Sequence, residues 1–161
     1  MIRSAVVTVS DSTFAGTRED KSGPALEARI LDLGWAMVSR HLVPDETAQI
    51  SSLLSQLVHG AAVDLIVTTG GTGLALRDVT PEATRSISNR EIPGFGETMR
   101  AAGLKSTKFA PLSRSTAFTA GPTLILNLPG SPKGAVESFE AVAALIPHAV
   151  DLLHGRTEHK Q

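Results

Sequence analysis

Short runs of β-branched and aliphatic residues alternate with segments of helical periodicity along almost the whole chain. Four of these runs predict strands, at residues 5–9, 36–42, 65–68 and 124–128. The third and fourth runs are almost wholly apolar, as expected of central parallel strands that are buried on both faces. The alternation therefore predicts an α/β fold of three layers, with a mostly parallel sheet and helices on both of its faces.

The segments between the predicted strands carry helix signals. Ser22 is a candidate N-cap, with Pro24 in the first turn and Gly34 just past the end of the helix. Further helices are predicted around the apolar stripe of residues 50–58, from Thr80 onwards, over residues 97–105 and over residues 139–153. We expect Pro147 to kink or divide the last of these helices.

Length and composition limit the class of protein. With 161 residues, the chain can bury one core, so we expect a single domain over residues 1–155 and a flexible polar tail over residues 156–161. The net charge of −1 argues against a nucleic-acid partner and favours small molecules or protein surfaces. The lack of cysteine excludes disulfides and thiolate metal sites. With no recognisable signal peptide or membrane-spanning run, we expect a cytoplasmic protein without a membrane partner.

Loops rich in polar residues and glycine follow all four predicted strands. They contain Ser10-Asp11-Ser12, Pro44-Asp45-Glu46, the glycine loop of residues 70–73, and Pro129-Gly130-Ser131. Ligands of open α/β sheets bind where loops leave the carboxyl ends of the strands. We therefore expect these loops to form one rim, a prediction that fails if Asp45 and Asp78 lie at opposite ends of the sheet.

The glycine loop suits an anion. Consecutive glycines reach positive φ and let peptide N–H groups approach a ligand without an intervening side chain. The loop lacks the Lys-Ser or Lys-Thr of a Walker A motif and the third glycine of the dinucleotide fingerprint. A tight connection between strand and helix is the alternative interpretation. The neighbouring Arg77 and Asp78 favour a functional phosphate cradle.

Asp45 and Asp78 are candidate metal ligands. Either residue alone is also typical of a helix N-cap or a turn. As a pair on adjacent loops they suit Mg²⁺, which binds a couple of carboxylates together with water and phosphate oxygens. The histidines show no ligand spacing. Lys133 and Arg114 could meet a phosphate group, although a lone basic residue on a loop is usually only solvated.

Several longer sequence blocks match a known pattern. The most specific joins TTGGTG at residues 68–73 to RDVTPEAT at residues 77–84, and others lie at residues 6–12, 43–46, 91–97, 112–115 and 127–132. Together they resemble the molybdopterin adenylyltransferase family of molybdenum cofactor biosynthesis, of the MogA and MoaB type. The resemblance covers nearly the whole chain. Residues 115–121 differ from the family pattern, and the resemblance does not separate the MogA type from the MoaB type.

The resemblance implies adenylyl transfer from Mg-ATP to molybdopterin, giving adenylylated molybdopterin and pyrophosphate, in a homotrimer. Asp45 and Asp78 match the family aspartates of metal handling and catalysis, with Mg²⁺ as the metal and ATP as co-substrate. The positions that match nucleotide and molybdopterin binding are Ser10, Asp11, Thr69, Gly70, Gly71, Thr72, Gly73, Ser113, Asn127, Pro129, Gly130 and Ser131. Because a phosphate of molybdopterin is the nucleophile, the site needs positioning and charge neutralisation rather than a strong general base.

Two alternatives keep the same fold, namely a catalytically weak molybdopterin carrier and a trimeric scaffold. The intact pair of Asp45 and Asp78 favours the enzyme over the carrier. An unrelated dinucleotide-binding domain is a weaker alternative, because its fingerprint is incomplete. No fused molybdate-insertion domain is recognised, so we expect a separate protein to insert the metal.

Overall fold

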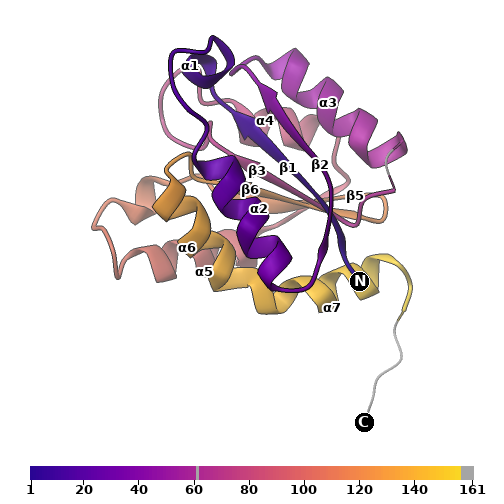
Figure 1. Cartoon of the computed structure of the whole chain (residues 1–161). Helices are drawn as coiled ribbons and strands as arrows, with labels where there is room; N and C mark the ends of the chain where they lie inside the picture. The colour runs from indigo at the N-terminus through magenta and orange to yellow at the C-terminus, as the bar shows by residue number, and fades with distance from the viewer. Residues whose placement is uncertain (61, 157–161) are drawn as a thin grey trace.

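The computed structural model, which describes residues 1–60 and 62–156, has a six-stranded sheet at its centre (Figure 1). The strands lie in the order β2-β1-β3-β6-β5-β4. Four of them pair in parallel, namely β2 (Ala36–Val43), β1 (Arg3–Val9), β3 (Leu65–Thr69) and β6 (Thr123–Leu128). Two antiparallel strands, β5 (Thr116–Ala120) and β4 (Arg90–Ile92), complete the sheet. The predicted, mostly parallel sheet is confirmed.

Successive residues of the central strands enter two different cores. In β1, Val6 packs in one core cluster while Ala5 and Val7 pack in the other. In β3, Val67 and Ile66 divide between the clusters in the same way. Side chains of a strand alternate between its two faces, so both faces of the sheet are covered.

Helices form the two outer layers (Figure 1). One layer contains α2 (Ser22–Asp32), α5 (Pro93–Gly103), α6 (Pro132–Val142) and α7 (Ile146–Leu153). The other contains α3 (Thr47–Gly60) and α4 (Thr80–Ser86). Their buried apolar residues belong to separate core clusters, so the predicted three layers are confirmed. No helix among the described residues has the length and apolar character needed to cross a bilayer.

Three short helical segments complete the part of the chain that the structure describes. The four-residue α1 (Asp11–Phe14) follows the carboxyl end of β1. The 3-10 turn η1 (Ala110–Leu112) precedes β5, and η2 (Ala143–Leu145) separates α6 from α7. Pro147 lies in the first turn of α7, so the predicted division of the last helix is confirmed.

Several element boundaries differ from the predictions. Helix α5 begins at Pro93, four residues before the predicted start at Glu97. The sequence does not predict strands β4 and β5. In the region of β5, residues 115–121 stand out only as a departure from the family pattern. Gly121, with φ of 56°, turns the chain from β5 into β6. Of the predicted tail, only Arg156 is among the described residues.

Ser22 is not the N-cap of α2, because it is the first residue of the helix itself and is buried. The Asp20 carboxylate provides the cap instead: its Oδ1 accepts a hydrogen bond of 3.0 Å from the Gly23 N–H. Its Oδ2 also accepts the Thr8 hydroxyl at 2.8 Å. Asp20 therefore attaches the start of α2 to the carboxyl end of β1, next to the rim of the sheet.

Candidate active site

A cleft of about 880 Å³ lies at the carboxyl ends of the parallel strands. Eight predicted site residues line it: Ser10, Asp45, Thr69, Gly70, Gly71, Asp78, Gly130 and Ser131. They come from the loops after β1, β2, β3 and β6, so the predicted convergence of four loops on one rim is confirmed. Parallel strands end at the same edge of a sheet, which is why residues so far apart in sequence meet here.

The glycine loop, residues 70–73, packs too closely for larger residues at its first two positions. Gly70 has φ of 104°, and a Cβ atom there would collide with the carbonyl oxygen of Val9. Gly71 has φ of 71°, and a Cβ atom there would collide with the Thr80 hydroxyl. Gly130 lies against Gly70, since its own Cβ would be 3.3 Å from the Gly70 Cα. Both the positive φ and the close packing therefore require glycine.

Asp45 and Asp11 hold each other through reciprocal hydrogen bonds. The Asp11 N–H donates to Asp45 Oδ2 at 2.9 Å, and the Asp45 N–H donates to Asp11 Oδ1 at 3.0 Å. Burial raises the pKa of Asp45 above its ordinary value, and repulsion from the charges of Asp11 and Asp78 adds to this effect. Asp11 does not line the cleft itself, so its part in the site is to hold Asp45 through these bonds.

Arg77 connects three of the rim loops. Its Nε and Nη2 atoms donate to the two carboxylate oxygens of Asp11 at 2.5 and 3.0 Å. Nη2 also donates to Glu46 Oε1 at 2.8 Å. This bonding lowers the pKa of Asp11 below its ordinary value. Because Asp11 holds Asp45, Arg77 fixes the position of that acid indirectly.

The two cleft carboxylates fit the chemistry of Mg²⁺. Asp78 Oδ2 accepts the Ala75 N–H at 3.0 Å. The second oxygens, Oδ1 of Asp45 and Oδ1 of Asp78, accept no hydrogen bond from residues 1–60 or 62–156. Within the same part of the chain, no group of three or more acidic, histidine or cysteine side chains could hold a metal ion. A metal ion here would need further oxygen ligands from phosphate and water, which is the coordination that Mg²⁺ prefers.

Residues 18–21 of the connection between β1 and α2 also line the cleft, together with Ser22 at the start of α2. The sequence does not predict a place in the site for any of them. Arg18 and Lys21 are exposed there, and neither makes an ion pair within the described part of the chain. Asp20 was recognisable as an acidic residue directly before a helix, but Arg18 carries no sequence signal of its own.

The remaining predicted site residues lie outside the lining of this cleft: Thr72, Gly73, Ser113, Asn127 and Pro129, together with Asp11. Asn127 is completely buried and donates to the Thr68 and Thr84 hydroxyls at 3.0 and 3.1 Å. Ser113 lines a second pocket of about 320 Å³, beside Arg85, Arg100 and Arg114. A direct contact of these residues with a ligand stays a prediction.

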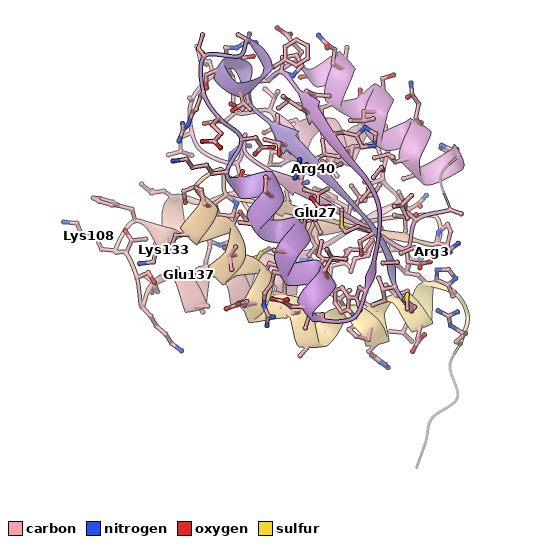
Figure 2. All side chains as sticks on the ribbon, in the orientation of Figure 1. Arg3, Glu27, Arg40, Lys108, Lys133 and Glu137 are labelled. Atoms are coloured by element: carbon pink, nitrogen blue, oxygen red, sulfur yellow. The ribbon has the colours of Figure 1, made fainter. Side chains whose placement is uncertain are left out.

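Lys133 lies away from the cleft. Its side chain is 79% exposed and its Nζ is 3.8 Å from Glu137 Oε1, one turn further along α6 (Figure 2). It does not line either pocket described above. Lys133 is therefore a solvated surface residue, as is usual for a lone basic residue.

An α/β fold with acidic residues and a glycine loop in one cleft is typical of nucleotide-using enzymes. Comparison with known proteins identifies the family. The chain matches the family described as "Probable molybdopterin binding domain" over residues 5–148 and belongs to it. It is 42% identical to the molybdopterin adenylyltransferase of Helicobacter pylori strain J99, over 96% of this chain and 89% of that protein. The molybdopterin adenylyltransferase of Escherichia coli K12 is 40% identical, over 96% of this chain and 86% of that protein.

A solved structure agrees with this assignment. The molybdopterin biosynthesis enzyme MoaB from Thermus thermophilus superimposes with a TM-score of 0.91 at 48% identity. The match covers 96% of this chain and 98% of that chain. The family resemblance, the three-layer fold and the mostly parallel sheet are thereby confirmed together.

Proposed function

We propose that this chain transfers the adenylyl group of ATP to molybdopterin and releases pyrophosphate. The observation that carries the proposal is the meeting of Asp45, Asp78 and the glycine loop in one cleft, in a close relative of named molybdopterin adenylyltransferases. A terminal phosphate oxygen of molybdopterin attacks the α-phosphorus of ATP. The bond between the α- and β-phosphates breaks, and its electron pair leaves with pyrophosphate.

Asp45 and Asp78 would hold Mg²⁺ in this proposal, and one carboxylate oxygen of each makes no hydrogen bond inside the described chain. Bound Mg²⁺ neutralises charge on the phosphates of ATP. Glycine-loop N–H groups and the N-terminus of α6, which begins after Ser131, supply hydrogen-bond donors on the same rim. Arg18 and Lys21 line the same cleft, and their positive charges attract the polyphosphate.

The second pocket is the proposed place of the pterin. It borders Ser113 and carries the hydroxyls of Ser115 and Thr116 as well as three arginines. Arg114 connects the two pockets, since it lines the second one and its Nη2 donates to the carbonyl of Asp78, which lines the first. Molybdopterin bound here would direct its phosphate toward the glycine loop and the nucleotide.

We further propose that the protein is a cytoplasmic homotrimer and that a separate protein inserts molybdate. The proposal of a trimer is supported by the family, and exposed apolar side chains such as Phe109 and Leu112 are available for subunit contacts. Light scattering of the purified protein tests it directly. A monomeric mass at micromolar concentration would contradict it.

The test of the activity combines purified protein with molybdopterin and Mg-ATP labelled at the α-phosphate. We expect label in adenylylated molybdopterin and an equal amount of pyrophosphate, with both products absent when Mg²⁺ is chelated. Tight molybdopterin binding without any label transfer would contradict the proposal and favour the carrier.

A further inference from the structure

All four carbonyl groups of the glycine loop accept hydrogen bonds from two residues. The Gly70 carbonyl accepts the Thr80 hydroxyl at 2.9 Å, and the Gly71 carbonyl accepts the Thr80 N–H at 3.1 Å. Arg114 supplies the other two bonds, from its backbone N–H to the Thr72 carbonyl at 2.9 Å and from its Nε to the Gly73 carbonyl at 2.8 Å. Thr80 and Arg114 thus engage every acceptor of the loop.

The N–H groups of the same loop are in the opposite situation. The Gly70 N–H donates to the Leu128 carbonyl at 3.0 Å. The N–H groups of Gly71, Thr72 and Gly73 meet no acceptor among the residues that the structure describes. A loop with its acceptors occupied and its donors available favours an anion, whereas a freely rotating peptide would also present a carbonyl oxygen that repels phosphate.

Each nitrogen of the Arg114 guanidinium has a protein partner in this arrangement. Besides its bonds to the loop, Nη2 donates to the Asp78 carbonyl at 2.5 Å, and Nη1 pairs with Glu82. Arg114 therefore fastens the glycine loop to the backbone of Asp78. Arg114 is one of the two basic residues that could meet a phosphate group on sequence grounds, and the structure instead places it against the glycine loop.

Thr80 is held in turn by a chain of buried hydrogen bonds. It is completely buried, and its carbonyl accepts the Thr84 hydroxyl at 2.8 Å. Asn127 donates to that hydroxyl from β6. Buried hydrogen bonds of this kind are costly to break, because a group that loses its partner cannot turn to water.

We propose that Thr80 and Arg114 are positioning residues that set the direction of the glycine-loop peptides, so that the loop offers only N–H donors to the phosphates of the nucleotide. The inference rests on the proposed function, since it assigns these residues to nucleotide binding in that reaction. Neither residue contacts the reacting atoms.

The test compares Thr80→Val, which keeps the shape but removes the hydroxyl, with Thr80→Ser, which restores it. Thr98→Val is the matched control, because the exposed Thr98 hydroxyl also donates to a glycine carbonyl, that of Gly94, at 2.9 Å. Calorimetry measures the affinity for magnesium pyrophosphate and for Mg-ATP. We expect Thr80→Val to weaken both affinities by roughly tenfold or more, as the loss of a buried partner implies. Thr80→Ser and Thr98→Val should bind like the wild type.

Steady-state kinetics distinguishes a specific effect on the glycine loop from a general loss of structure. Thr80→Val should raise the KM for Mg-ATP while the KM for molybdopterin stays unchanged. Arg114→Lys, which keeps the charge but loses the planar fork, should also bind pyrophosphate more weakly and serves if Thr80→Val does not fold. Its control is Arg40→Lys, which alters only the exposed pair with Glu27, 2.8 Å apart (Figure 2).

Wild-type affinity in both Thr80→Val and Arg114→Lys would overturn this inference and leave the proposed function standing. The absence of label transfer by the wild type would instead refute the proposed function, and the inference with it.

Discussion

Gly71 is the residue on which the shape of the glycine loop depends most directly. Its backbone is left-handed, and a Cβ atom added to it would collide with the Thr80 hydroxyl. We expect Gly71→Ala to reduce adenylyl transfer by on the order of a hundredfold, because the loop must shift away from its donor geometry.

Gly34→Ala is the control for Gly71→Ala, because it introduces the same backbone strain without a collision between side chains. Gly34 also has a positive φ, of 76°, but no atom lies within 4 Å of a Cβ built there. Both variants pay the strain of about 1 to 2 kcal/mol that a left-handed alanine carries. Equal activity in the two variants would show that the contact with Thr80 has no part in shaping the site.

Asp45 combines a functional charge with an unfavourable environment. Burial, together with the charges of Asp11 and Asp78, raises the pKa of Asp45 in the folded protein. Ionisation of Asp45 therefore costs more free energy in the folded protein than in the unfolded chain. As a result, the free energy of unfolding falls as the pH rises through the pKa of Asp45 in the folded protein. Asp45→Asn should then melt at a higher temperature than the wild type at neutral pH without metal, and should not turn over.

Thermal unfolding of the two proteins from mildly acidic to neutral pH measures this effect. The difference in melting temperature should shrink as the pH falls below the pKa of Asp45. A lower melting temperature of Asp45→Asn at neutral pH would show that its charge stabilises the fold instead.

At the scale of elements, the sequence predicted the parallel strands better than the antiparallel ones. The apolar runs of β3 and β6 are distinctive because both faces are buried. Strand β5, with the sequence Thr-Ala-Phe-Thr-Ala, has small and polar residues that form no clear run. Its pairing with β4 and β6 comes from tertiary contacts, which local periodicity does not record.

Arg77 acts at the scale of elements, because it joins the loops that follow β1, β2 and β3. Its ion pairs are exposed, so they contribute little to the stability of the whole protein. We expect Arg77→Lys to weaken Mg-ATP binding by roughly tenfold with an almost unchanged melting temperature, since lysine cannot bond Asp11 through two nitrogens.

Arg156→Lys is the control for this substitution, because Arg156 also forms an exposed pair, with Asp151 at 3.0 Å, at a site far from the cleft. Calorimetric titration with Mg-ATP distinguishes the two. Identical affinities of Arg77→Lys and Arg156→Lys would remove Arg77 from the description of the site.

At the scale of the whole molecule, a second charged cluster lies at the amino-terminal ends of the strands. Asp64 is buried and accepts hydrogen bonds from the N–H and the guanidinium of Arg3, all between 2.8 and 3.1 Å long. His154, just after α7, lies 3.1 Å from Asp64 Oδ1. Asp64, directly before β3, is thus bonded to the start of β1 and lies beside the end of the last helix.

Burial alone would raise the pKa of Asp64, but the bonds from Arg3 outweigh it and lower that pKa below its ordinary value. The ionised form therefore adds stability above the unfolded pKa, and this stability is lost as the pH falls through the folded pKa. We expect Asp64→Asn to cost about 1 to 3 kcal/mol at neutral pH. Denaturant unfolding should show the loss diminishing in acid, and the exposed Asp151→Asn should show neither effect.

The rim of the site was predictable and its supporting network was not. Parallel topology alone places Asp45, Asp78 and the glycine loop at one edge. The cap by Asp20 and the bonds of Arg114 to the loop depend on how distant segments pack, and no spacing in the sequence records them. Asn127 illustrates the difference, since its motif suggested ligand contact while the structure buries it beneath α4.

Asp78 is proposed to serve adenylyl transfer rather than the fold. The most direct test measures the rate of label transfer from Mg-ATP to molybdopterin by Asp78→Asn beside the wild type, with thermal unfolding of both. We predict a loss of at least about a hundredfold in rate, with a melting temperature close to that of the wild type. Transfer at the wild-type rate by a folded Asp78→Asn would contradict the claim.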